Sequence, residues 1–308
     1  MFMKKGKNTL LLIGMITVLA GCGHSVARYD QRLAKKLEWQ NFESQVIESN
    51  GQKLFFWDNK NSEKPPLIFV HGFGGDGKIS WSRQVNDFKD DYRVIIPDIL
   101  WFGESYSDKE PSLVSQIEAI QWLIEELNLE KVNVVGISYG GFITLGLAHI
   151  YPENLRRIVI VNSPGAAISD AEIEAFCKSV GVEKINEAFV PKTGEDVQRL
   201  LDFSFYKKPP IPKFLMDQIL AQYFSKHPLE QNKLLDELPG NREKLKGEVA
   251  VPVSIIWGEK DEIFTISEAY RLKDALNADL HVIEKSGHAL PGEKPKEFNA
   301  VLRSVLEK

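Results

Sequence analysis

The chain is 308 residues long, 43% of its residues are hydrophobic, and its formal net charge at pH 7 is −5. This length is enough for one large α/β domain, with any second lobe arriving as an insertion. The acidic balance, without a basic patch interleaved with aromatic residues, argues against a nucleic-acid partner.

Residues 1–21 are predicted to be an export signal. Three lysines precede an apolar run from Leu10 to Ala20, which is shorter than a typical membrane-spanning helix. The run ends in Leu-Ala-Gly-Cys, with the cysteine at position 22, and this ending resembles the bacterial lipoprotein signal. The resemblance implies cleavage before Cys22 and a lipid on its sulfur. The alternatives are an ordinary secretory signal and an uncleaved anchor.

A lipid on Cys22 implies a protein outside the cytoplasm, anchored to a membrane of the bacterial cell envelope. Gly23 stands where an aspartate would favour retention in the inner membrane, so the outer membrane is favoured in a Gram-negative organism. Cleavage would remove three lysines and no acid, and so shift the net charge from −5 to −8. Acylation of Cys22 leaves Cys177 without a disulfide partner, so stability must come from the core.

Residues 22–44 are predicted to be a tether that contains a short basic amphipathic helix. Between Val26 and Trp39, apolar residues recur every three or four positions with arginines and lysines between them. Two interpretations stay open. The helix lies on the membrane surface, or it packs on the domain as an ordinary first helix.

Residues 45–165 and 249–308 are predicted to be the two parts of one α/β domain. Asn50 and Gly51 mark a hairpin turn, and short apolar strand segments then alternate with amphipathic helices. Strands are expected at 67–70, 93–96, 132–135, 158–161, 253–257 and 280–283, and helices at 112–127, 142–150, 267–276 and 294–306. This alternation predicts a mostly parallel, doubly wound sheet, whose ligands bind beyond the carboxyl ends of the strands.

Residues 166–248 interrupt the alternation. Helices are expected over 172–182 and 213–224, with a proline-rich joint from Lys207 to Pro212 between them. A long helical insertion between two strands of a sheet is typical of a lid over a ligand site.

The sequence Gly136-Ile137-Ser138-Tyr139-Gly140 joins a buried strand to an apolar helix. A serine on so sharp a turn is held in a strained backbone conformation with its hydroxyl exposed over the sheet, and the glycines give room for the turn. The pattern predicts that Ser138 is a nucleophile. The alternative is a strand–helix turn that contains a serine by chance.

A nucleophilic serine needs a base and a group that orients the base. Of the six histidines, His288 follows the last strand in a loop of small residues, so the sheet edge places it near Ser138. The orienting acid must come from a strand end between the two, and the loop of residues 258–262 offers three carboxylates. Asp98 also ends a strand but precedes the serine, and it is expected to bond loop amides.

His71-Gly72-Phe73-Gly74-Gly75 follows another strand and lacks the ending of a phosphate-binding loop. A glycine-loosened turn can direct the backbone N–H of Phe73 at the position where negative charge develops, and the N–H of Tyr139 is the second expected donor. The alternative is a plain tight turn.

These motifs stand in the order that they have in the α/β-hydrolase superfamily, which the chain resembles from Glu48 to Leu306. The stretches 81–84 and 97–103 resemble its lid-bearing esterase and monoacylglycerol-lipase-like branch. The resemblance identifies Asp261 as the orienting acid, with Glu259 as the fallback. No cofactor and no metal are expected, since the sequence has neither paired metal ligands nor a dinucleotide motif.

The resemblance implies a serine hydrolase that cleaves carboxylic esters with short to medium acyl chains, or monoacylglycerol-like esters, through an acyl-enzyme. Its partners are then a small-molecule ester and, through Cys22, a membrane. A carbon–carbon bond hydrolase with the same triad is the first alternative. A non-catalytic surface lipoprotein on this scaffold is the second.

Apolar side chains are expected to form the substrate pocket, because hydrophobic and aromatic residues line most ligand sites. The expected wall consists of Phe73, Trp81, Trp101, Phe142 and Leu290. Four residues of the insertion can complete it, namely Phe203, Phe205, Phe214 and Phe224. The alternative is that these aromatic residues belong to the core.

Overall fold

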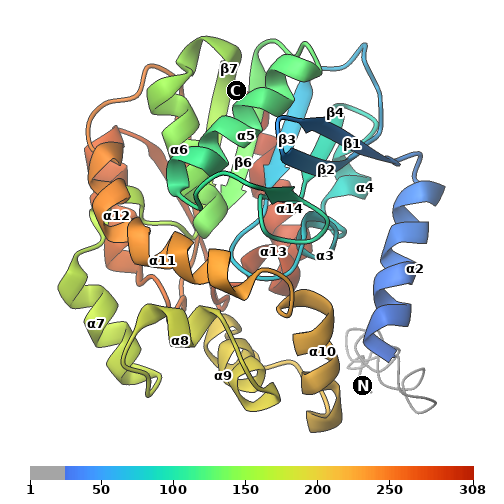
Figure 1. Ribbon diagram of the computed structural model, residues 1–308. Coiled ribbons are helices and arrows are strands. Elements are labelled where there is room, and N and C mark those ends of the chain that lie inside the picture. Colours follow the sequence, from blue (N-terminus) through green and yellow to red (C-terminus); the bar gives the residue numbers. More distant parts are fainter. Residues whose placement is uncertain (1–24) are drawn as a thin grey trace, which may run out of the picture.

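The computed structural model describes residues 25–308 (Figure 1). The predicted signal peptide and the predicted lipidation site at Cys22 lie outside the described residues. Within residues 25–308, no helix is long and apolar enough to cross a membrane.

A nine-stranded sheet forms the centre of the domain, in the order β1-β2-β4-β3-β6-β7-β8-β9, and β5 pairs with β2. The strands are β1 (Glu43–Ser49), β2 (Gln52–Asp58), β3 (Pro66–Val70), β4 (Arg93–Pro97), β5 (Tyr106–Ser107), β6 (Val132–Ile137), β7 (Leu155–Val161), β8 (Val253–Gly258) and β9 (Asp279–Ile283). The β1–β2 hairpin and the β2–β4 pair are antiparallel, and β4, β3, β6, β7, β8 and β9 are parallel. The predicted hairpin and mostly parallel sheet are therefore confirmed.

Helices cover both faces of the sheet (Figure 1). Those of the core are α3 (Gly77–Trp81), α4 (Val85–Phe88), α5 (Leu113–Glu126), α6 (Tyr139–Ile150), α12 (Ile266–Leu276), α13 (Leu290–Glu293) and α14 (Pro295–Leu306). Ser112 caps α5, because its hydroxyl accepts the N–H of Ser115 at 3.1 Å. The helices predicted over 112–127, 142–150, 267–276 and 294–306 are confirmed within a few residues as α5, α6, α12 and α14. The short helices α3, α4 and α13 were not predicted.

Two hydrophobic clusters lie on opposite faces of the sheet. Successive residues of a strand point to opposite faces, and β3 accordingly sends Ile68 and Val70 into one cluster and Leu67 and Phe69 into the other. All four of these side chains are fully buried. The continuous apolar strands that the sequence contains are thus explained by a sheet covered on both sides.

The first described helix, α2 (Ser25–Trp39), packs on the domain. Its apolar residues Val26, Leu33 and Leu37 are buried against the protein, while Arg28 and Arg32 are exposed. The backbone N–H of Val26 donates to the side-chain oxygen of Gln218 in the insertion at 3.3 Å. Of the two interpretations of this segment, the structure has the one in which it packs as a first helix.

The insertion between β7 and β8 lies below the sheet in the view of Figure 1. Its helices are α7 (Asp170–Ser179), α8 (Ile185–Phe189), α9 (Gly194–Ser204), α10 (Met216–Tyr223) and α11 (Pro228–Arg242). They share a separate hydrophobic cluster that includes Phe176, Phe189 and Phe203. Helices over 172–182 and 213–224 were predicted, and α7 and α10 confirm them within a few residues. The proline-rich joint connects α9 to α10.

Candidate active site

The turn between β6 and α6 holds Ser138 in a strained conformation, with φ 53° and ψ −120°. A Cβ on Gly140 would stand 2.4 Å from the carbonyl oxygen of His71, and one on Gly136 would stand 2.2 Å from that of Gly140. Side chains at these two positions cannot fit without moving the backbone. The glycines therefore permit the turn that places Ser138 at the carboxyl edge of the sheet, as the sequence predicted.

His288 and Asp261 meet beyond the carboxyl ends of β8 and β9. The Nδ1 atom of His288 lies 2.8 Å from Oδ2 of Asp261, and both side chains are buried. The other carboxylate oxygen, Oδ1, accepts the backbone N–H groups of Ile263 at 2.9 Å and Phe264 at 3.0 Å. With Oδ1 occupied by amides, Oδ2 is left to hold the imidazole in one orientation, with Nε2 as the free ring nitrogen.

Glu259 lies in the same loop but does not meet His288. Its carboxylate accepts the backbone N–H of Lys285 at 3.0 Å and pairs with Lys260 at 3.2 Å. These contacts lower the pKa of Glu259. The hydrogen bond from the Lys285 amide has the largest effect, and that from Lys260 the next largest. Of the two acids left open by the sequence, the geometry brings only Asp261 to the histidine.

Asn162, which the sequence analysis did not single out, ties the strand ends together. Its amide nitrogen donates to the carbonyl oxygens of Gly287 at 3.1 Å and His288 at 2.8 Å, and its oxygen accepts the N–H of Gly258 at 2.8 Å. This fully buried side chain therefore fixes the histidine loop to the ends of β7 and β8. The signal available in the sequence was a polar residue directly after a buried strand.

The turn after β3 packs directly on the nucleophile. A Cβ on Gly72 would stand 3.0 Å from the Cβ of Ser138, so glycine lets the turn approach this closely. The ring centroids of Phe73 and Tyr139 lie 5.6 Å apart in an edge arrangement, and both residues border the same pocket as Ser138. The two residues predicted to offer backbone N–H donors are thus gathered around the serine.

His71 is a structural histidine. Its Nδ1–H donates to the carbonyl oxygen of Gly72 at 2.7 Å, and its Nε2 accepts the N–H of Ile99 at 3.0 Å. Burial lowers its pKa to about 4, so the ring is neutral near pH 7. A neutral ring with both nitrogens engaged holds the turn of residues 71–75 against the strand end at β4.

Asp98 bonds loop amides, as predicted. Its carboxylate accepts the N–H of Gly77 at 2.9 Å and that of Glu104 at 3.0 Å. Burial and the nearby charge of Asp76 raise its pKa to about 8. A Cβ on Gly103 would stand 2.0 Å from this carboxylate, so the loop of residues 98–104 can close around it only with glycine there.

A narrow apolar pocket of about 50 Å³ lies over Ser138, between the core and the insertion. Phe73 and Phe142 border it, as predicted, and the insertion adds Ile168, Ile173, Ile185, Phe189, Leu235 and Leu238. Such a wall suits the hydrocarbon part of a substrate.

For the other residues of the expected wall, the prediction is wrong, because they do not border the pocket. Trp81 packs against Phe69 and Phe298, Trp101 belongs to the core cluster around β3 and α5, and Leu290 is fully buried beside α14. Phe203 and Phe224 lie in the core of the insertion, Phe205 does not border the pocket, and Phe214 is 60% exposed. Most of the aromatic residues proposed for the wall belong to the hydrophobic clusters, as the alternative interpretation held.

Arg242 also borders the pocket, and this residue was not predicted. Its side chain is only 4% exposed, and Nη2 forms an ion pair with the exposed carboxylate of Asp170. Within residues 25–308, its Nε and Nη1 atoms have no hydrogen-bond partner. A buried guanidinium with two unpaired nitrogens is costly, and a substrate oxygen would relieve that cost.

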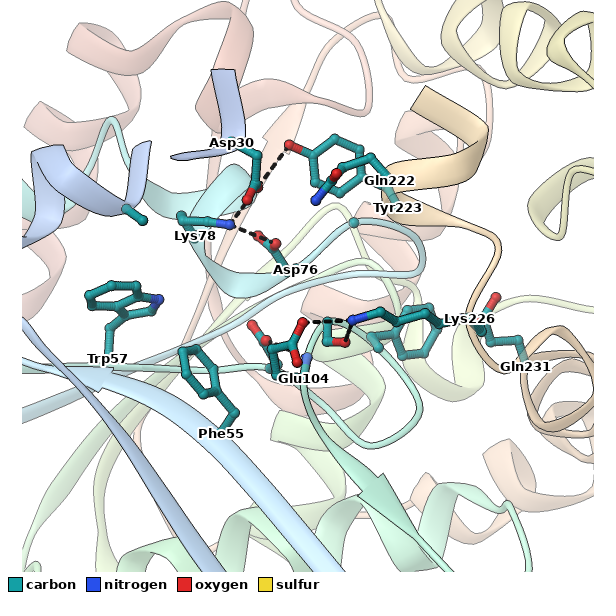
Figure 2. A pocket seen from close by; sticks show the side chains of 15 residues that line it. Asp30, Phe55, Trp57, Asp76, Lys78, Glu104, Gln222, Tyr223, Lys226 and Gln231 are labelled. Carbon is teal, nitrogen blue, oxygen red and sulfur yellow. Dashed lines mark hydrogen bonds and ion pairs between the residues drawn. The ribbon is translucent and has the colours of Figure 1, made fainter. Parts of the chain in front are cut away.

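A second cavity, of about 140 Å³, lies between α2, β2 and α10 (Figure 2). Lys78 donates there to Asp30 at 2.5 Å and to Asp76 at 3.1 Å, and the hydroxyl of Tyr223 donates to Asp30 at 3.1 Å. These pairs join α2 to α3 and to α10 of the insertion. None of the predicted triad residues borders this cavity, so the candidate active site is the pocket over Ser138.

The fold and the strand-end geometry together define the class of protein. A family model described as alpha/beta hydrolase fold matches residues 65–295, and the chain belongs to this family. The predicted superfamily is thereby confirmed.

Lipases and dienoate hydrolases are both among the proteins similar to this chain. The chain is similar to Lipase 1 of Psychrobacter immobilis, with 30% identity over 272 residues, which cover 84% of this chain and 83% of the relative. It is also similar to a 2-hydroxy-6-oxo-6-phenylhexa-2,4-dienoate hydrolase of Comamonas testosteroni, with 26% identity over 264 residues, 80% of this chain and 90% of the relative. Among solved structures, a membrane phospholipase A shares the fold, with a TM-score of 0.77, 20% identity and coverage of 97% and 98% of the two chains.

Proposed function

We propose that the protein is a serine hydrolase that cleaves carboxylic esters through an acyl-enzyme. The observation that carries this proposal is the 2.8 Å contact of His288 with Asp261, at the sheet edge where Ser138 stands on its strained turn. A nucleophile, a base and an orienting acid are the groups that acyl transfer requires. The similarity to lipases supports the ester as substrate.

The proposed reaction has two halves. The hydroxyl oxygen of Ser138 attacks the acyl carbon while Nε2 of His288 takes its proton, and the N–H groups of Phe73 and Tyr139 stabilise the oxyanion. The intermediate then expels the alcohol, which receives the proton from His288. Water repeats the sequence on the acyl-enzyme and releases the acid. Asp261 orients the imidazole and stabilises its charged form throughout.

The insertion serves as a lid in this proposal. Six of its apolar side chains close the pocket from the side opposite the sheet, and the enclosed space is small. Binding should strengthen by up to about 0.8 kcal/mol for each acyl CH₂ buried, until the wall leaves no more room. The preferred substrates are therefore esters with short to medium acyl chains, or monoacylglycerol-like esters, over long-chain triglycerides.

A panel of p-nitrophenyl esters of increasing acyl length tests this preference. We expect kcat/KM to rise through the short chains and to fall once the chain exceeds the pocket. Leu238→Ala, which enlarges the wall, should move the maximum to longer chains, and Leu229→Ala, at a site that is 75% exposed, should leave it unchanged. A flat profile in the wild type would contradict the assignment of this pocket to the acyl group.

Arg242 favours a second candidate function, carbon–carbon bond hydrolysis by the same triad. Two unpaired nitrogens of a buried guanidinium suit a substrate that carries a carboxylate or a vinylogous carbonyl. The similarity to dienoate hydrolases supports the same reading. A clear preference of the wild type for a vinylogous diketone acid over every ester in the panel would replace the ester proposal with this one.

The lipid anchor is a separate proposal. Cys22 at the end of the predicted signal would carry the lipid, and α2 begins only three residues later, at Ser25. We expect Cys22→Ser to release the protein from membranes or to block its processing, whereas Cys177→Ser, at a buried and unpaired thiol, should leave membrane attachment unchanged. Fractionation with mass spectrometry of the mature N-terminus decides this. A soluble, unlipidated wild type would contradict the proposal.

A further inference from the structure

The histidine loop is bonded to the insertion as well as to the sheet. Gly287 lies so close to the segment after α9 that a Cβ there would stand 2.6 Å from the backbone nitrogen of Tyr206. The N–H of Ala289 donates to the carbonyl oxygen of Ser204 at 2.8 Å. The residues on both sides of His288 thus touch the end of α9, more than 80 positions earlier in the chain.

Glu293, the last residue of α13, joins the two segments with one carboxylate. Its Oε2 accepts the N–H of Gly287 at 2.7 Å and that of Tyr206 at 3.2 Å, and its Oε1 accepts the N–H of Lys207 at 3.0 Å. Hydrogen bonds to an ionised acceptor are shorter and stronger than neutral ones. One side chain therefore satisfies three backbone donors, one in the histidine loop and two in the insertion.

The backbone around Glu293 is itself fixed. Leu290 and Pro291, one turn earlier in α13, are buried, and the N–H of Glu293 donates to the carbonyl oxygen of Ala289 at 3.0 Å. The segment that Glu293 holds has little else to fix it, because Tyr206 and Lys207 are exposed and lead into the proline-rich joint. The rigid partner in this contact is α13, and the segment that would otherwise move is 205–207.

We infer that Glu293 is a positioning residue that couples the lid to the catalytic histidine. Its carboxylate holds the insertion at the end of α9 and the loop that carries His288 in one arrangement, so a shift of either segment displaces the other. This inference rests on the proposed role of His288 as the base. The lid is then attached to α13 near its middle, at residues 206 and 207. Its opening movement must take place in other parts of the insertion, such as α7 and α8 or the α10–α11 pair.

Glu293→Ala and Glu293→Gln test the inference. Alanine removes all three acceptor bonds, and glutamine keeps the shape but presents an amide NH₂ to a backbone N–H. A displacement of about 1 Å in a catalytic group costs roughly a hundredfold in rate. We therefore expect kcat for a short-chain ester to fall about ten- to hundredfold in both variants, with KM changed less than about threefold, because the pocket wall is untouched.

Hydrogen exchange measured by mass spectrometry separates coupling from a general loss of stability. In both Glu293 variants, the peptides that contain residues 204–208 and 286–289 should exchange faster together, while those from β6 and β7 keep their wild-type rates. Trypsin should also cleave after Lys207 faster than in the wild type. Glu297→Gln is the matched control, since this exposed carboxylate lies one turn further on and, among residues 25–308, pairs only with Lys294, at 3.8 Å.

Several outcomes would overturn the inference while leaving the proposed function intact. They are an unchanged kcat in both variants, a loss no larger than that of Glu297→Gln, faster exchange confined to one of the two segments, and faster exchange throughout the domain. If alanine prevents folding, the glutamine variant carries the test alone. A wild type that is inactive toward every ester would instead refute the proposed function.

Discussion

Ser138→Ala is expected to lower the turnover of p-nitrophenyl esters by about four or more orders of magnitude, and His288→Ala should do the same. Without the hydroxyl there is no covalent intermediate, and without the imidazole the hydroxyl is too weak a nucleophile. Since the two groups act as a unit, the double variant should be scarcely less active than either single variant.

The controls for this experiment test whether the variants keep the wild-type fold. Circular dichroism and thermal unfolding should show that both variants are folded, because each substitution removes only a few side-chain atoms. His281→Ala, which removes a half-buried imidazole from the edge strand β9, should keep nearly full activity. If the Ser138 or the His288 variant retained even a tenth of the wild-type turnover, the proposed mechanism would be wrong.

Asp261→Asn is expected to have the next largest effect, a fall in kcat of about three to four orders of magnitude. An asparagine that presents its NH₂ group to Nδ1 favours the wrong tautomer of His288 and cannot stabilise the imidazolium that forms during the reaction. The effect should be somewhat smaller than that of Ser138→Ala, because the nucleophile and the oxyanion donors remain. The kcat of purified variants on a short-chain ester measures this.

Glu259→Gln is the matched control for that variant. It neutralises a carboxylate two residues away that contacts Lys285 and Lys260 but not the histidine. We expect its kcat to stay within about threefold of the wild type, because exposed ion pairs contribute little. A larger loss in Glu259→Gln than in Asp261→Asn would show that the acid has been assigned to the wrong residue.

The features that the sequence predicted well are those with a strong local signal. Asn50 and Gly51 adopt positive φ angles of 49° and 73°, as a tight hairpin requires, and only a few residue types do so readily. The turn at Ser138 is recognisable in the sequence because two glycines flank it, and the structure leaves no room for a side chain at either position. Alternating apolar runs and amphipathic helices set the parallel sheet, and the parallel sheet brings the strand ends to one edge.

The pocket wall could not be predicted, because it depends on which face of which element an aromatic side chain occupies. Trp81 and Phe142 have the same apolar character in the sequence and both are buried, yet only Phe142 also borders the pocket. Arg242 gave no signal for a related reason. It ends a helix that contains Pro239 and Gly240, residues that argue against a helix there, so neither α11 nor the face carrying Arg242 was predicted.

The strained backbone at Ser138 also bears on how this sequence can change over generations. A non-glycine residue held at a positive φ costs on the order of 1–3 kcal/mol, whereas glycine adopts that conformation freely. Folding alone therefore favours glycine at this position, and under the proposed mechanism selection for turnover opposes it. In a lineage whose substrate had disappeared, mutation would be expected to remove the serine early, since its loss would make the protein more stable.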